Sequence, residues 1–173
     1  MRKSFADMAR SLGLMAVIVA VVLVIGGRYL IAPGKGAQMP AADYSSVVQQ
    51  FPREAGSPVL APHSIPSSWR ANAARLSAPA PGAVQMHIGW ALPADRYAGL
   101  DEATGDPVSL LRAVLGAAGL EARGSTRIGS DLWNVRRAAN GEEALTRTDG
   151  KLTVVVTGNA TDAELRMLAG SLS

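Results

Sequence analysis

The stretch KLTVVVTGNATDAELRMLAGSL, residues 151–172, predicts a buried strand followed by a helix. Its apolar part, LTVVVTG, lacks the polar alternation of a strand with one wet face, so we expect both faces to be covered. Thr161 and Glu164 have the spacing of a capping box, in which each side chain satisfies a free amide at a helix start. The helix would then pack through one apolar face, formed by Leu165, Leu168 and Leu172.

An earlier part of the chain shows the same order of elements. Strands are predicted at residues 69–77, 83–92 and 96–103, before a helix at 106–119; the second set is 131–138, 142–148 and 151–158, before a helix at 161–172. Apolar residues alternate along 83–92, which indicates one buried and one open face. Each βββα unit alone would leave its sheet half covered. The sequence therefore predicts an α+β domain, an antiparallel sheet built from two βββα units with two helices packed on it.

The first predicted helix carries clear end signals. Asp106 is a natural N-cap, Pro107 suits the first helical position, and Gly119 is expected to end the helix.

The N-terminal region predicts a membrane anchor. Residues 1–10 form a basic tail, and residues 11–32 a transmembrane helix; from Leu12 to Ile31 the span is about 30 Å long, which matches the bilayer core. We expect three residues at the membrane interfaces, namely Arg10, Arg28 and Tyr29. Positive charges in the tail favour a cytoplasmic N-terminus and a C-terminal domain outside.

A cleaved signal peptide is the alternative for this region. A helix that stops at Gly26-Gly27 has the length of a signal-peptide core, but no good cleavage site follows it. Whether residues 1 to about 34 are retained therefore stays open. The glycine pair also allows a structural subunit that is recognised through its transmembrane helix.

Six of the ten prolines lie in residues 33–66. Proline fixes φ and removes an amide donor, so this segment is predicted to be an extended stalk. The extracytoplasmic α+β domain is expected to occupy residues 67–173.

Charge and composition exclude several function classes. The formal net charge of +3 arises within residues 1–28, and the rest of the chain is balanced, so we expect no nucleic-acid partner. The chain has no cysteine, which excludes disulfides, thiolate metal sites and a cysteine nucleophile.

No catalytic, cofactor or metal site is predicted. Nucleotide-binding, zinc-protease and serine-hydrolase motifs are absent, and neither His63 nor His87 has a neighbour at chelating spacing. We expect a solvent-facing His87. The acidic pairs Asp101-Glu102 and Glu142-Glu143 are interpreted as charges at strand ends and turns, since adjacent strand residues point to opposite faces.

Aromatic and basic residues receive structural interpretations. Trp69, Trp90 and Trp133 lie on predicted strands and are expected to pack in the core, with stacking on envelope sugars as the minor hypothesis. Five arginines between residues 120 and 150 are interleaved with acidic residues, so they predict a solvated surface; these are Arg123, Arg127, Arg136, Arg137 and Arg147.

The order of basic tail, single span, proline-rich segment, SSW, DLW and the terminal VVVTGNATDAELRMLAGSLS resembles an uncharacterised family of single-pass membrane proteins from actinobacteria, a domain of unknown function. The resemblance covers most of the chain and is best marked in the last strand and helix and at Trp69 and Trp133. It implies a retained anchor and an envelope location, and it carries over no catalytic residue. At the level of fold alone, the doubled βββα unit is similar to PsbP-like sandwiches.

These observations together predict a non-enzymatic binding or accessory module of the cell envelope, single-pass in the cell membrane. Its partners would be the lipid bilayer and an envelope protein or polymer, and no cofactor is expected. The alternative is an envelope hydrolase whose carboxylates are distant in sequence. A His87 beside a carboxylate would favour that enzyme, whereas an exposed groove would favour the binding module.

Overall fold

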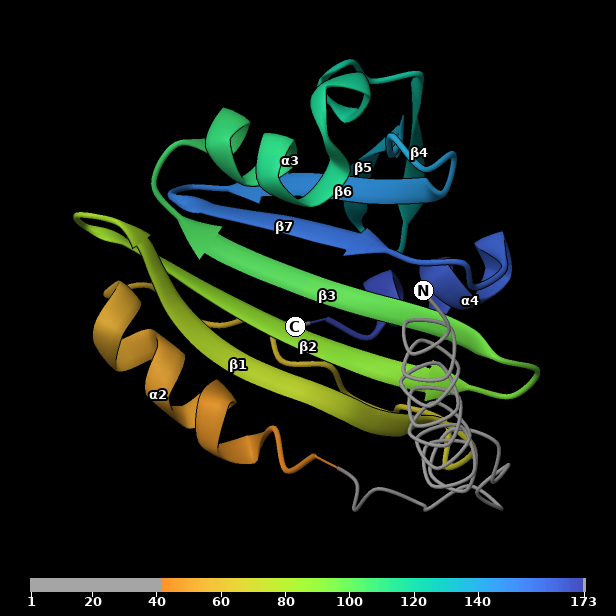
Figure 1. Ribbon diagram of the computed structural model, residues 1–173, viewed down its shortest axis with the longest axis horizontal. Helices are drawn as coiled ribbons and strands as arrows, with labels where there is room; N and C mark the ends of the chain where they lie inside the picture. The colour runs from red at the N-terminus through yellow and green to blue at the C-terminus, as the bar shows by residue number, and fades with distance from the viewer. Residues whose placement is uncertain (1–41, 173) are drawn as a thin grey trace, which may run out of the picture. The chain divides into compact units, whose positions relative to one another are not determined.

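A seven-stranded antiparallel sheet organises the computed structural model, which describes residues 42–172 (Figure 1). The strands are β1 (Arg70–Ala80), β2 (Ala83–Leu92), β3 (Arg96–Thr104), β4 (Gly124–Ile128), β5 (Asp131–Arg137), β6 (Glu143–Asp149) and β7 (Leu152–Thr157). Their order across the sheet is β1-β2-β3-β7-β6-β5-β4. Two meanders, β1–β3 and β4–β7, therefore meet where β3 pairs with β7.

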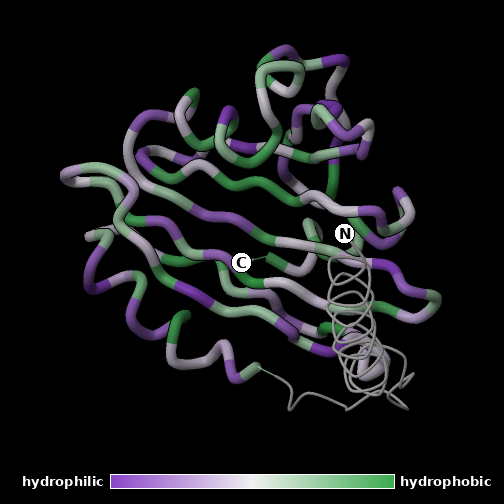
Figure 2. Tube along the Cα trace, viewed as in Figure 1, coloured by the Kyte–Doolittle hydropathy of each residue, from purple (hydrophilic) through white to green (hydrophobic). Residues whose placement is uncertain are grey.

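Helices cover both faces of this sheet (Figure 1). Helices α2 (Ser45–Ala55) and α4 (Asp162–Gly170) pack on one face, where the larger apolar core lies. Helix α3 (Pro107–Leu115) and the 3₁₀ turn η1 (Ala117–Leu120) lie on the other, above a smaller cluster that includes Ala103, Ala144 and Val155. The tube in Figure 2 shows hydrophobic stretches along the central strands and hydrophilic ones along α2 and the loops.

The predicted α+β class and antiparallel sheet are confirmed, but the count of elements differs. The first βββα unit is present, whereas the second contains four strands because β4 precedes it. Three α-helices pack on the sheet instead of two. The sequence of β4, GSTRI, has no apolar alternation that would predict a strand. This edge strand is held by pairing with β5 along its whole length.

Local signals at helix ends and in the last strand mostly agree with the structure. Asp106 accepts hydrogen bonds from the amides of Val108 and Ser109 at 3.3 and 3.0 Å, and the capping box of α4 is formed. Strand β7 is buried along nearly its whole length, as expected of a central strand. The prediction that Gly119 ends α3 is wrong: the helix stops at Leu115, and Gly116 adopts the positive φ (+73°) that glycine tolerates best.

The segment expected to be an extended stalk contains a packed helix. Helix α2 lies inside residues 33–66 with Pro52 within it, and the compact unit of the chain is Pro40–Ser173, so folding begins well before residue 67. Val47, Val48 and Phe51 share one face and pack into the core. The proline count concealed this amphipathic spacing.

Residues 56–66 continue the packing of α2 across the same sheet face. Val59, Leu60 and Ile65 contact the core, and Pro62 forms an isolated bridge with Leu172. The part of the predicted stalk that the structure describes is therefore attached to the domain.

The predicted tail and transmembrane helix, with Arg10, Arg28 and Tyr29, lie outside the described residues. Within residues 42–172, no helix is both long enough and apolar enough to cross a bilayer.

Removing the Phe51 ring tests whether α2 belongs to the folded unit. Phe51 is fully buried, so Phe51→Ala should lower the free energy of unfolding by about 3 to 5 kcal/mol, through lost burial and the cavity left behind. Gln50→Ala, an exposed change on the same helix, should alter it by less than about 0.5 kcal/mol. Urea unfolding measures both; equal small effects would show that α2 is not part of the cooperative unit.

Candidate functional site on the open sheet face

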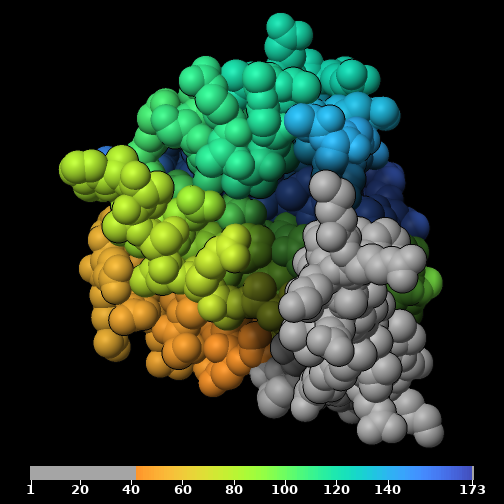
Figure 3. Space-filling model, in the orientation of Figure 1, coloured from red at the N-terminus to blue at the C-terminus, as the bar shows by residue number. Residues whose placement is uncertain are grey.

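Among residues 42–172, the helices leave half of the α3 side of the sheet uncovered. Helix α3 packs over β3 and β7, while no described helix packs on β1 and β2 on this side; yellow-green atoms of these strands can be seen at the surface in Figure 3. Arg75, His87 and Asp101 pair across β1, β2 and β3, so their side chains share this face. We call this region the open face.

A chain of polar contacts runs across the open face. The Tyr97 hydroxyl lies 3.0 Å from His87 Nε2, and His87 Nδ1 lies 3.0 Å from Asp101 Oδ1. Gln85 Nε2 donates to the same Asp101 oxygen at 3.0 Å. Only 5% of the Asp101 side chain and 13% of the His87 side chain are exposed. The core of this network, His87 and Asp101, is therefore packed within the sheet.

The partners of His87 assign its tautomer. A carboxylate only accepts hydrogen bonds, so in the neutral tautomer that fits this contact the proton of the imidazole lies on Nδ1, facing Asp101. Nε2 then accepts a hydrogen bond from the Tyr97 hydroxyl. Asp101 orients His87, and His87 orients Tyr97.

Two glycines make room for the Tyr97 ring. Gly89 and Gly99 face each other on β2 and β3, and a Cβ on Gly89 would lie 2.6 Å from the Tyr97 hydroxyl oxygen. The Asn72 side chain also reaches this position, because an irregularity in β1 between residues 71 and 73 directs it to the open face. The ring thus rests against bare backbone.

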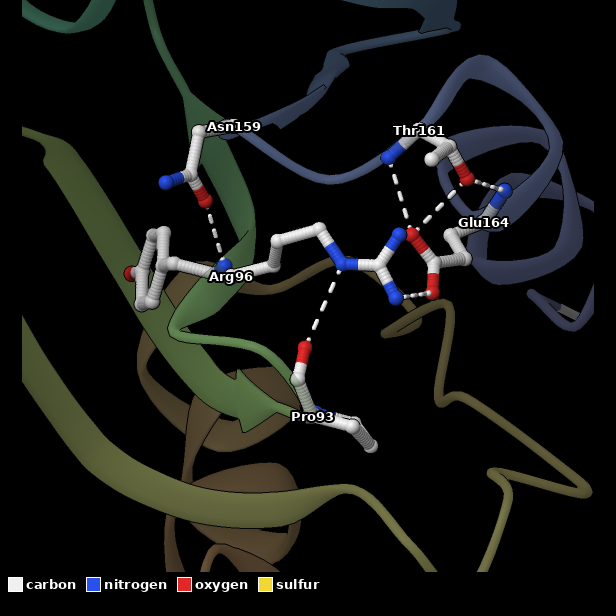
Figure 4. A network of polar contacts seen from close by, with 6 residues as sticks. Pro93, Arg96, Asn159, Thr161 and Glu164 are labelled. Atoms are coloured by element: carbon white, nitrogen blue, oxygen red, sulfur yellow. Dashed lines mark hydrogen bonds and ion pairs between the residues drawn. The ribbon is translucent and has the colours of Figure 1, made fainter.

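The corner of the fold that contains Asn159, Arg96 and Glu164 (Figure 4) also fixes the backbone of Tyr97. Asn159 Oδ1 accepts the Tyr97 amide at 2.5 Å, and the Tyr97 carbonyl accepts the Ala160 amide at 3.0 Å. Beside it, Arg96 bonds the Pro93 carbonyl and pairs with Glu164 at 3.0 Å. The turn after β7 and the start of α4 therefore hold Tyr97 in register.

Burial and the negative charge of Asp101 raise the pKa of Tyr97. The phenol accordingly stays protonated at neutral pH and acts as a hydrogen-bond donor. This favours a recognition role over a phenolate nucleophile.

A groove adjoins the network between α3 and the β1–β2 hairpin. Its volume is about 240 Å³, and its wall is mainly apolar, with Pro79, Ala103 and Leu110 among the lining residues. Gln85 lines it as well and so connects it to Asp101. A small concave site with few polar groups is typical of a ligand-binding surface.

The opposite face of the sheet holds a buried carboxyl group. Glu102 is fully buried; its Oε2 accepts the Leu60 amide at 3.1 Å, and its Oε1 has no hydrogen-bond partner in the structure. Burial is the main cause that raises its pKa to about 8. Glu102 is therefore mostly protonated at neutral pH, and we assign it a structural role beneath residues 56–66.

The structure corrects the interpretations of the histidine and the acidic pair. His87 is largely buried and hydrogen-bonded, so the expectation that it faces solvent is wrong. Asp101 and Glu102 do point to opposite faces, but they are buried in the middle of β3, not at a strand end. Sequence spacing could not show that β2 and β3 align His87 with Asp101. The alternation in residues 83–92 gave the one available signal, because it placed His87 on the less apolar face.

Other candidate residues are placed as follows. The three tryptophans are buried, as predicted; they are Trp69, Trp90 and Trp133. His63 donates its backbone amide to the Ser171 carbonyl, near the isolated bridge. Among residues 42–172 there is no group of three or more histidine, aspartate or glutamate side chains that could hold a metal ion.

Two arginines differ from the predicted solvated surface. Arg136 bonds Thr146 and the carbonyl oxygens of Gly119 and Leu120, which fastens η1 to the sheet. Arg147 pairs with Asp131 and lies 5.2 Å from the centre of the Trp133 ring. Both belong to the packed structure.

Glu102 should make stability depend on pH. The folded state keeps this proton up to about pH 8 and the unfolded chain only to about 4.5, so unfolding free energy should fall as pH rises between those values. The loss is on the order of 4 kcal/mol. Glu102→Gln should remove this part of the slope, and Glu121→Gln, an exposed change, should keep it. Urea unfolding from pH 5 to 8 measures it; equal slopes in all three proteins would contradict the assignment.

Gly89→Ala should displace the Tyr97 ring. The added Cβ would overlap the hydroxyl, so we expect a loss of about 1 to 3 kcal/mol in unfolding free energy and loss of the Tyr97–His87 contact. Gly124→Ala meets nothing within 4 Å and should be nearly neutral. NMR of the His87 ring nitrogens measures the contact: Nε2 should resonate as an acceptor in the unchanged protein. An undisturbed His87 signal in the Gly89 variant would contradict this geometry.

Comparison with known proteins identifies a family. A search of curated proteins finds no match to the chain. A family model described as "Protein of unknown function (DUF4245)" matches residues 1–172. Since this match covers almost the whole sequence, the chain belongs to that family.

Proposed function

We propose that this protein is a membrane-tethered extracytoplasmic binding module of the cell envelope, which recognises its ligand on the open face. The α+β domain supplies the binding surface, and residues 11–32 supply a single-pass anchor with Arg10, Arg28 and Tyr29 at its interfaces. The N-terminus would be cytoplasmic. Single-pass topology and an actinobacterial origin, which the family resemblance implies, are part of this proposal.

One observation carries the binding role: an uncovered half-sheet presents an ordered polar network beside a groove. Helices α2 and α4 cover the other face, and an antiparallel sheet with one solvated face is common, so the ordered network and the groove distinguish this surface. Asn72 and Arg75 extend onto the open face and make no hydrogen bond or ion pair within residues 42–172. Exposed polar groups that have no partner among these residues are available to a ligand.

The anchor hypothesis draws its support from the sequence. A run of about 20 apolar residues follows a basic tail, which is typical of a membrane-spanning helix. A helix that is apolar on all sides beside a basic tail does not fit the core of a soluble domain. A short connection before residue 42 would then join the anchor to the domain, because α2 already packs in the domain.

An envelope hydrolase is the second candidate, favoured by the position of His87 beside Asp101. Tyr97, His87 and Asp101 have the order of a nucleophile, a base and an orienting group. The raised pKa of Tyr97 disfavours this chemistry. Tyr97→Phe separates the two candidates: it would abolish hydrolysis by this route but would retain the ring on which a bound ligand rests.

The absence of cysteine allows a clean test of topology. We expect a Ser125→Cys variant to react with a membrane-impermeant maleimide in intact cells, since Ser125 is exposed on β4. Ser4→Cys, in the tail, should react only after the membrane is permeabilised. Labelling of both in intact cells, or of neither, would contradict the proposed orientation.

Carbonate extraction tests retention of the anchor. The full chain should remain in the membrane fraction, and a variant lacking residues 11–32 should be released. N-terminal sequencing of the membrane-bound protein should begin before residue 11. A released mature chain that begins beyond Gly26 would support the signal-peptide alternative instead.

A further inference from the structure

We infer that the open face binds a neutral carbohydrate, one whose hydroxyl groups hydrogen-bond across β1–β3 while a sugar ring packs against Tyr97. The inference rests on the proposed function, and it adds the chemical class of the ligand. Four observations on the open face lead to it: free donors and acceptors, balanced charge, an aromatic ring on a flat floor, and the adjoining groove.

Donors and acceptors are interleaved on the open face. Gln85 donates its side-chain amide to Asp101 Oδ1, which leaves the side-chain oxygen of Gln85, Oε1, without a partner among residues 42–172. Asp101 is itself almost fully buried, so it orients Gln85 and His87 beneath this surface. The Asn72 amide and the Arg75 guanidinium add unpaired donors, and Asn72 adds a further acceptor. A hydroxyl group both donates and accepts, so adjacent hydroxyls of a sugar match a mixed set better than a purely anionic or cationic ligand does.

Charges of both signs surround this surface. Arg70 and Arg75 lie on β1 and Asp101 on β3, and the negative charge of Glu142 contributes to the raised pKa of Tyr97. A polyanion such as nucleic acid or a phosphate-rich polymer would meet Asp101 and Glu142, and a polycation would meet Arg70 and Arg75. Electrostatic complementarity therefore selects an uncharged polar ligand.

Tyr97 supplies an apolar platform among these polar groups. Its ring tip lies against Gly89 and Gly99, where no side chain separates it from the backbone. The corner at Asn159 fixes its backbone, so little conformational entropy is lost when a ligand packs on it. A sugar ring combines apolar C–H groups with hydroxyls at its edge and so fits an aromatic ring bordered by amides and carboxylates.

The groove provides room for a neighbouring part of the ligand. At about 240 Å³ it is smaller than typical drug-sized sites, and it opens beside Gln85 at one end of the polar row. A chain of sugar units that extends from Tyr97 past Asp101 would reach it. The minor hypothesis from the sequence was that the tryptophans stack on sugars. All three are buried in the core, so we assign the stacking role on the open face to Tyr97.

The test is an NMR titration of the full chain in lipid nanodiscs, which avoids sugar-based detergents. Ring signals of labelled tyrosine and histidine report Tyr97 and His87. The probes are tetrasaccharides of glucose, mannose, arabinose and N-acetylglucosamine, and an extract of the source envelope. Portions of that extract are treated with periodate, which cleaves vicinal diols, or with protease. We expect at least one tetrasaccharide and the untreated extract to shift Tyr97 and His87, and periodate to abolish the effect of the extract.

Matched variants locate the site. Asn72→Ala and Arg75→Ala should each weaken binding about tenfold, because each removes an unpaired hydrogen-bonding side chain. Neither side chain has a partner among the described residues, so the fold should tolerate both changes. Asn134→Ala and Arg123→Ala, exposed changes near the other edge of the sheet, should leave affinity unchanged.

The outcomes separate this inference from the proposed function. A shift that protease abolishes and periodate does not would overturn the carbohydrate inference but would keep the binding role of the open face. If the Asn134 and Arg123 variants lose the shifts while the Asn72 and Arg75 variants retain them, the site lies elsewhere. That result would overturn both the carbohydrate inference and the binding role of the open face. The absence of any shift at Tyr97 or His87 with every probe would also overturn both.

Discussion

The antiparallel pairing of β3 with β7 is the contact on which the rest of the structure depends. These strands join two meanders that are separated in sequence by α3 and η1, and their side chains contribute to the apolar clusters on both faces. Because side chains alternate along a strand, two neighbouring residues on β3 point to opposite faces of the sheet. Asp101 completes the polar network on one side, and Glu102 supports the packed segment on the other. A shift of one residue in this pairing would exchange their environments.

This arrangement accounts for what the sequence could and could not predict. Strong local signals, such as the apolar run of β7, the Asp106 cap and the capping box of α4, were sufficient to place the central elements and the fold class. Helix α2 was not predicted because Pro52 within it and the prolines around it outweighed a short amphipathic pattern, and β4 was not because an edge strand needs little apolar surface. In both cases tertiary packing overrides local composition.

The candidate site was harder to predict because it arises from register. Nothing in the spacing of residues 87, 97 and 101 indicates that they touch; the β2–β3 hairpin aligns His87 with Asp101, and two facing glycines admit Tyr97. A bend in β1 adds Asn72. Such a site depends on which residues lie opposite one another, and a single sequence does not encode that information as a motif. The membrane anchor shows the converse case, since its evidence lies entirely in local sequence.

The fastening of residues 56–66 has a mechanical consequence. This segment enters the domain from α2 and is held by the Leu60 amide on Glu102 and by the His63 amide on Ser171, beside the bridge between Pro62 and Leu172. A tensile load applied from the N-terminal side would first reach α2 and these few bonds, before the sheet itself. Phe51 in the core and the bonds at Leu60 and His63 therefore lie between such a load and the β3–β7 ladder, so the packing of α2 shields the strands that carry the open face.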